Sequence, residues 1–205
     1  MKKSGIITLA VIAILVIVLF VSGKSAYNSM VTLEQDVDEA WAKVEVQYQR
    51  RMDLIPNMVE TVKGYAEHES STYEKVTQAR AGLSDAYNAA KEQSATVTPA
   101  DTEAFDRYNQ AQQGLNKALS IYVNAVKEAY PDLKADVQFT NLQTTLEGTE
   151  NRIATERGRY TGVVKEYNLK VKRFPANIWA SIFGFSAKPQ FASDPEAATA
   201  PKVSF

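Results

Sequence analysis

Apolar side chains recur at intervals of three and four residues from Ser25 to Phe174, which is the period of an α-helix. No stretch of comparable length alternates with the two-residue period of a β-strand. The pattern divides into four segments, at about residues 26–54, 56–92, 101–129 and 132–173. We therefore expect an all-α protein, built as an antiparallel four-helix bundle with long helices.

Two breaks between these segments contain a proline. Residues 94–99 end in Pro99 and are typical of a loop, after which Asp101 or Thr102 can cap the next helix through a side-chain oxygen. Pro131 disfavours helical backbone at Tyr130 and suits the first turn of a following helix. Both positions predict helix boundaries.

The first break has two candidate positions. Pro56 lacks a backbone donor and costs about 3 kcal/mol inside a straight helix, which favours a turn within residues 53–56. Gly64 is the alternative, because the apolar period continues through both residues. A turn at Pro56 gives four segments of similar length.

The N-terminal segment is apolar on every side. A basic tip, residues 1–4 with Lys2 and Lys3, precedes residues 5–23, which carry no charge. At about 1.5 Å per residue this helix spans roughly 28 Å, close to the hydrocarbon core of a bilayer. A cleaved signal peptide is the alternative, but the apolar run is long for one and lacks an Ala-x-Ala site. The positive-inside rule favours the N-terminus inside and the bundle outside.

An even number of antiparallel helices returns the chain to the membrane, where an uncharged apolar segment follows at residues 175–185. This segment can lie in the membrane interface or fold back to plug the open end of the bundle. Residues 186–205 are rich in Ala, Pro and Ser and are expected to form a flexible tail. The side chains expected near the membrane are Tyr27, Phe174, Trp179, Phe183 and Phe185.

The amino-acid composition excludes some kinds of binding site. The absence of cysteine excludes disulfides and thiolate metal sites. The net charge is −1, and without Lys2, Lys3 and Lys24 only 20 basic side chains face 24 acidic ones. A mildly acidic domain has no electrostatic reason to bind nucleic acid, so we expect none.

Charged side chains gather at two places, before and after the predicted first turn and within the fourth segment. They can form ion pairs that set the register between helices, or a patch for a partner or an anionic ligand. His68 is the only histidine, and neighbouring residues on a helix point about 100° apart, so no metal site is expected. The candidate patch comprises Arg50, Arg51, Asp53, Asn57, His68, Glu69, Glu150 and Arg157.

Four longer motifs give the chain a specific resemblance. These are residues 50–59 (RRMDLIPNMV), 62–69 (VKGYAEHE), 130–135 (YPDLKA) and 148–154 (GTENRIA). Together with the apolar N-terminus, they resemble the LemA family of bacterial membrane proteins, over nearly the whole chain. The resemblance implies a short membrane helix and a four-helix bundle, and it implies no defined activity.

Three functions fit these features. The first is a membrane-anchored scaffold that binds a membrane or envelope protein, through the region of residues 50–57 or the Trp179 segment. The second is a ligand sensor or enzyme that uses Arg50, Arg51, Asp53 and His68. The third is membrane shaping by the Trp179 segment. The sequence has no Gly-rich phosphate loop and no His-Glu-x-x-His motif, so it predicts no catalytic residue and no cofactor.

Overall fold

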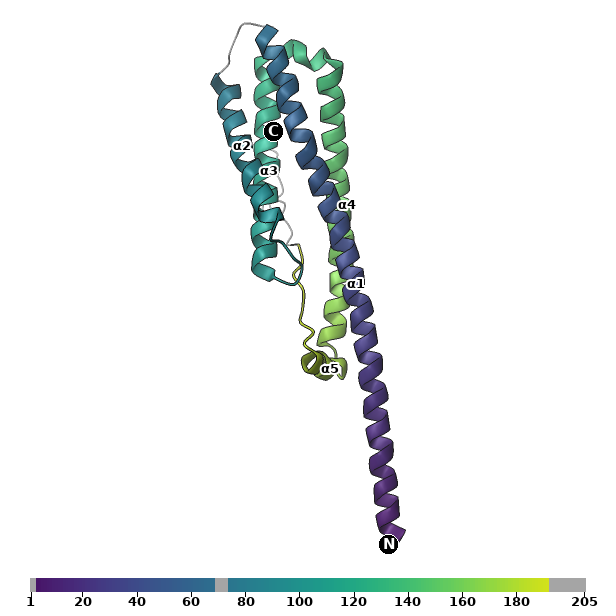
Figure 1. Ribbon diagram of the computed structural model, residues 1–205. Coiled ribbons are helices and arrows are strands. Elements are labelled where there is room, and N and C mark those ends of the chain that lie inside the picture. The colour runs from purple at the N-terminus through teal and green to yellow at the C-terminus, as the bar shows by residue number, and fades with distance from the viewer. Residues whose placement is uncertain (1–2, 69–73, 192–205) are drawn as a thin grey trace, which may run out of the picture.

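The computed structural model describes residues 3–68 and 74–191, and these form five α-helices and one short 3₁₀ helix without a strand (Figure 1). This confirms the predicted all-α class. The elements in chain order are α1 (Lys3–His68), α2 (Glu74–Ser94), α3 (Thr102–Ala129), η1 (Pro131–Ala135), α4 (Val137–Lys172) and α5 (Ala176–Phe183).

Helix α1 runs without interruption from the apolar N-terminal segment to the far end of the bundle. Both Pro56 and Gly64 lie inside it, so the predicted turn at residues 53–56 and its alternative at Gly64 are wrong. The proline ring is exposed, whereas the nearby side chains of Met52, Ile55 and Met58 are buried in the core. Burying each of these side chains is worth about 1.5–3 kcal/mol, which together outweighs the cost of proline. The break between the first two bundle helices lies after His68, and residues 69–73 are outside the described part.

The four bundle helices associate as two close pairs. Helix α1 lies along α4, and α2 lies along α3 (Figure 1). Large aromatic side chains connect the pairs, because Phe105 and Tyr108 of α3 reach into the α1–α4 pair. The ring centroid of Trp41 lies 5.3 Å from that of Phe105, and the centroids of Tyr48 and Tyr108 are 5.6 Å apart. These large rings keep the backbones of the two pairs further apart than the backbones within each pair. Where no ring fills the space between the pairs, a site can form.

Both predicted proline boundaries correspond to helix ends. Asp101 caps α3 by accepting hydrogen bonds from the backbone N–H groups of Glu103 and Ala104. Pro131 opens η1, and α4 begins only after Asp136, whose carboxylate accepts from the N–H of Phe139. The fourth helix therefore starts later than the predicted residue 132.

The apolar segment after Phe174 folds back onto the base of the bundle. The indole of Trp179 lies directly over Gly23, and a Cβ atom at Gly23 would come within 3.0 Å of its ring. Tyr27 makes edge-on contacts with Phe183 and Phe185. This packing still leaves apolar surface on the outside, since Ile178 is 49% exposed and Ile182 is 63% exposed.

The prediction of a flexible tail from residue 186 is wrong for residues 186–191. Asn168 exchanges two hydrogen bonds with the backbone of Lys188, and the Tyr160 hydroxyl donates to the Pro189 carbonyl. The Lys188 ammonium lies 3.0 Å from the Glu34 carboxylate. Phe191 then packs among the rings of the core, 5.0 Å from the centroid of Phe105. Residues 192–205 lie outside the described part of the chain.

Among the described residues, α1 is the one helix long and apolar enough to cross a membrane, by length and composition. Its large side chains from Ile6 to Val21 are all exposed, whereas Met30, Val37 and Val44 are fully buried against the bundle. One helix therefore changes from an apolar surface on all sides to an apolar stripe on one side.

Substituting Gly23 by Leu should detach α5 from α1, because the new side chain must displace the Trp179 ring. Overpacking of this kind costs about 1–3 kcal/mol. Hydrogen exchange of the α5 amides should then accelerate by an order of magnitude or more. Gly158→Ala is the matched control, since a Cβ atom there meets nothing within 4 Å. Unchanged exchange in Gly23→Leu would show that the contact does not hold α5.

Buried tyrosines should make the bundle sensitive to alkali. Burial raises the pKa of Tyr167 to about 12, and it also raises the pKa values of Tyr108, Tyr122 and Tyr160. In the unfolded chain these phenols lose their protons near pH 10, before the folded chain does. The contribution of these tyrosines to the free energy of unfolding should therefore be constant below about pH 10 and be lost as the pH rises toward 12.

Urea unfolding at a series of pH values tests this, with Tyr167→Phe as the variant. Its stability should fall less between pH 9 and 12 than that of the wild type. Equal slopes would contradict a perturbed Tyr167.

Candidate functional site

The structure separates the residues of the predicted patch. Arg51 is only 2% exposed and points into the bundle, whereas Arg50, Asp53 and Asn57 lie on the exposed face of α1. Arg51 does meet Glu150, and Arg157 lines the same pocket. The structure therefore brings Arg51, Glu150 and Arg157 together and places Arg50, Asp53 and Asn57 on another face.

The other two members of the patch lie at or beyond the end of α1. His68 is the last residue of this helix, and its side chain and Glu69 are outside the described part. Seventeen residues of helix separate Arg51 from His68, which at about 1.5 Å per residue is roughly 25 Å. A single site made from Arg50, Arg51, Asp53 and His68 is therefore excluded by the length of the helix.

Arg51 reaches the interior because it occupies a core position of α1. Tyr48, Arg51, Met52 and Ile55 lie at the spacing of one helix face, and all four are buried. The guanidinium carbon lies 5.4 Å from the centre of the Tyr48 ring. The apolar surroundings require the charge to be paired and hydrogen-bonded.

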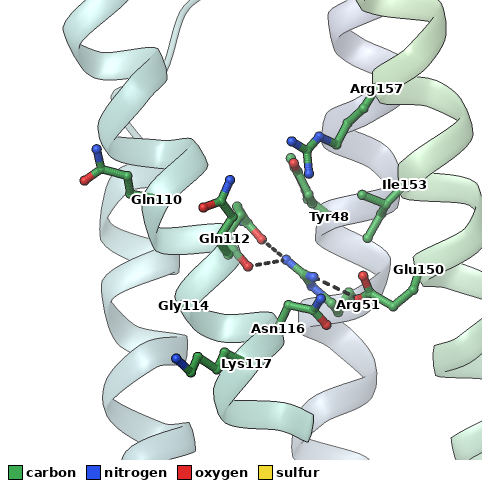
Figure 2. A pocket seen from close by; sticks show the side chains of 11 residues that line it. Tyr48, Arg51, Gln110, Gln112, Gly114, Asn116, Lys117, Glu150, Ile153 and Arg157 are labelled. Atoms are coloured by element: carbon green, nitrogen blue, oxygen red, sulfur yellow. Dashed lines mark hydrogen bonds and ion pairs between the residues drawn. The ribbon is translucent and has the colours of Figure 1, made fainter. Parts of the chain in front are cut away.

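The guanidinium of Arg51 joins three helices (Figure 2). Its Nη1 atom donates to Glu150 Oε1 of α4 at 2.8 Å. Its Nη2 atom donates to the backbone carbonyl of Gln112 in α3 at 3.1 Å, and also to the Gln112 side-chain oxygen. Arg51 thus ties the α1–α4 pair to α3, at a level where large side chains hold the pairs apart.

A pocket of about 510 Å³ opens beside this guanidinium. In Figure 2, the side chains that line it come from α3 on one side and from α1 and α4 on the other. Three polar atoms of its lining residues are buried from solvent and have no hydrogen-bond partner within the described chain. These are the Tyr48 hydroxyl, Arg51 Nε and Gln112 Nε2.

The tyrosines at this site are held neutral. Burial raises the pKa of Tyr48, and the nearby charges of Arg157 and Arg51 offset only part of that rise. Burial also raises the pKa of Tyr108. The phenols can therefore donate hydrogen bonds over the whole physiological pH range. The described residues contain no cluster of His, Cys, Asp and Glu that could hold a metal ion.

Sequence reasoning missed Gln112 and Lys117. A signal for Gln112 was present, because it falls in phase with the apolar series of α3 that includes Tyr108, Leu115 and Leu119. A glutamine at a core position of a helix indicates a buried hydrogen-bond partner. Lys117 is exposed on α3, and nothing in the sequence pattern distinguishes it from other surface lysines.

Removing one partner of the Arg51–Glu150 pair should cost more than removing both. Glu150→Ala leaves a buried guanidinium without its carboxylate, and we expect a loss of about 2–4 kcal/mol, allowing for partial exposure of Glu150. In the double variant Arg51→Met/Glu150→Met no charge remains to be compensated, so it should be more stable than Glu150→Ala. Urea denaturation measures both. A double variant less stable than Glu150→Ala would contradict this account of the pair.

Comparison with known proteins supports a common family. The chain matches the LemA family over residues 40–205. It is 29% identical to magnetosome protein MamQ 2 of Paramagnetospirillum magneticum over 198 residues, covering 91% of this chain and 72% of that protein. Magnetosome protein MamQ of Magnetospirillum gryphiswaldense is 27% identical over 179 residues, covering 82% of this chain and 65% of the relative. The family match begins within α1, at residue 40, and continues through α2, α3, α4 and α5, so it covers most of the bundle, and the apolar start of α1 precedes it. The chain is therefore a membrane-associated protein that belongs to the LemA family.

Proposed function

We propose that this protein is a scaffold at the bacterial cell envelope, which holds a helical bundle upright on the membrane and presents it to an envelope protein. The observation that carries the proposal is the continuity of α1. A helix shared by anchor and bundle leaves no flexible linker between them, so the bundle keeps a fixed orientation.

The distal end of α1 is far from the anchor. At about 1.5 Å per residue, the part of α1 after Gly23 extends roughly 65–70 Å. Helix α4 packs along much of this length and stiffens it. With the N-terminus inside and the bundle outside, such a rod presents binding surface well clear of the lipid headgroups.

The base of the bundle is suited to contact with the bilayer surface. Helix α5 packs on Gly23, the last residue of the apolar segment, so it lies at the level where that segment ends. Its outer residues Ile178 and Ile182 are exposed, and so are Phe174 and Phe183. Apolar and aromatic side chains at this height fit the interfacial region of a membrane. We expect α5 to seat the rod on the lipid.

An exposed stripe on α1 is the surface we assign to the partner. Val46, Arg50, Asp53 and Asn57 follow one another at intervals of four, three and four residues, which places them on one face. All four are exposed, and Val46 is a large apolar side chain that is 62% exposed. One apolar residue among polar and charged ones suits a partner protein better than a lipid surface.

Photocrosslinking in living cells tests the scaffold. A photoreactive amino acid at Arg50 or Asn57 should capture one discrete envelope protein. The same group at Thr155, which is exposed on α4, serves as the matched control and should not capture it. Equal labelling at all three positions would contradict a specific partner on the α1 stripe, and capture of a cytoplasmic protein would reverse the orientation.

A further inference from the structure

The pocket beside Arg51 contains more positive than negative charge. Arg51, Lys117 and Arg157 line it together with a single carboxylate, Glu150. Glu150 pairs with Arg51. Within residues 3–68 and 74–191, neither Lys117 nor Arg157 forms an ion pair, although the Arg157 guanidinium lies 4.4 Å from the centre of the Phe191 ring. Two cations thus face the pocket without a carboxylate partner.

Its buried unpaired groups can all donate hydrogen bonds. The side-chain oxygen of Gln112 accepts from Arg51, which turns the Gln112 amide nitrogen away from Arg51 as a donor. Arg51 Nε has no acceptor, and the Gln112 amide nitrogen makes no well-formed hydrogen bond, although the Gln112 side chain interacts with the Tyr108 hydroxyl and lowers the pKa of that phenol. Both Arg51 and Gln112 are 2% exposed. Each buried donor left unsatisfied costs about 1–3 kcal/mol. An acceptor that reached these donors from the pocket would remove this cost, and the Tyr48 hydroxyl, which is also buried and unpaired, can supply a further donor.

We propose that this pocket binds a compact anion that carries a carboxylate or phosphate group, attracted by the charges of Arg51, Arg157 and Lys117, and that the side chains of Arg51, Gln112 and Tyr48 turn to offer it the donors that are buried behind the pocket wall. The combination of donors and two unpaired cations distinguishes an anion from a neutral acceptor. A volume of about 510 Å³ accommodates a small ligand. Glu150 disfavours anions whose charge extends to its side of the pocket.

A bound anion would contact both helix pairs. Gln112 and Lys117 belong to α3, whereas Tyr48 and Arg51 belong to α1 and Arg157 belongs to α4. Ligand binding to the folded state alone raises its stability in proportion to the logarithm of ligand concentration. The anion should therefore strengthen the junction between the pairs. This inference depends on the pocket alone and stands or falls independently of the scaffold role.

Calorimetric titration of the full chain in lipid nanodiscs tests the proposal. Inorganic phosphate and succinate are the two probes, and sodium chloride at equal ionic strength is the reference. We expect saturable binding of at least one probe, with a melting temperature that rises with its concentration. Binding of phosphate alone or of succinate alone identifies which of the two groups the site recognises.

Variants assign the binding to this pocket. Lys117→Gln and Arg157→Gln should each weaken binding about tenfold, whereas Arg152→Gln, which removes the same charge from an exposed position of α4, should leave it unchanged. Lys117 is exposed and contributes little packing, so its substitution separates lost binding from lost folding. Absence of saturable binding by both probes would overturn the proposal. So would an equal loss in Arg152→Gln, or full binding in both pocket variants.

Discussion

Helix α1 imposes the main constraint on this structure, because it must satisfy two environments in one unbroken run. Its first part is apolar on every side, and its second part has a single apolar stripe that packs on α4 and on the core. No flexible segment lies between the two parts. The position of each side chain around the helix axis therefore fixes how the bundle is rotated relative to the apolar first part. This rotation places Gly23 on the side of α1 that meets Trp179. It also places the stripe from Val46 to Asn57 on the exposed side.

Arg51 imposes a second constraint, because its hydrogen bonds fix the positions of α3 and α4 relative to α1. A buried guanidinium adds little net stability, since its desolvation offsets most of the attraction to Glu150. Its main effect is on helix register, because its N–H groups have fixed directions and bind only where Glu150 and Gln112 are correctly placed. The same directions leave Nε without a partner inside the bundle. The residue that sets the register of the helices is therefore also the one that gives the pocket its polar wall.

The sequence predicts the helical class because the apolar period is regular over most of the chain. It places helix boundaries near Asp101 and Pro131 because those effects are local. It fails at Pro56, since a local penalty of about 3 kcal/mol is outweighed by burial that depends on partner helices. The docking of residues 186–191 escapes prediction for the same reason, because Lys188 and Phe191 meet residues distant in sequence. Arg51 and Glu150 belong to the charged set expected to form either ion pairs or a patch. The helical period alone could not show that these two residues pair, that Arg50 and Asp53 face outward, or that Gln112 completes the site.

The continuity of α1 between its apolar first part and the bundle can be measured directly, because the chain has no cysteine of its own. Spin labels on Ile7→Cys and Val46→Cys, both exposed positions, report the distance between the anchor and the bundle in lipid nanodiscs by double electron–electron resonance. A continuous helix predicts one narrow distribution centred at roughly 58 Å, from about 1.5 Å per residue. A broad distribution, or a peak at much shorter distance, would show a hinge between anchor and bundle and would contradict the account of an upright rod.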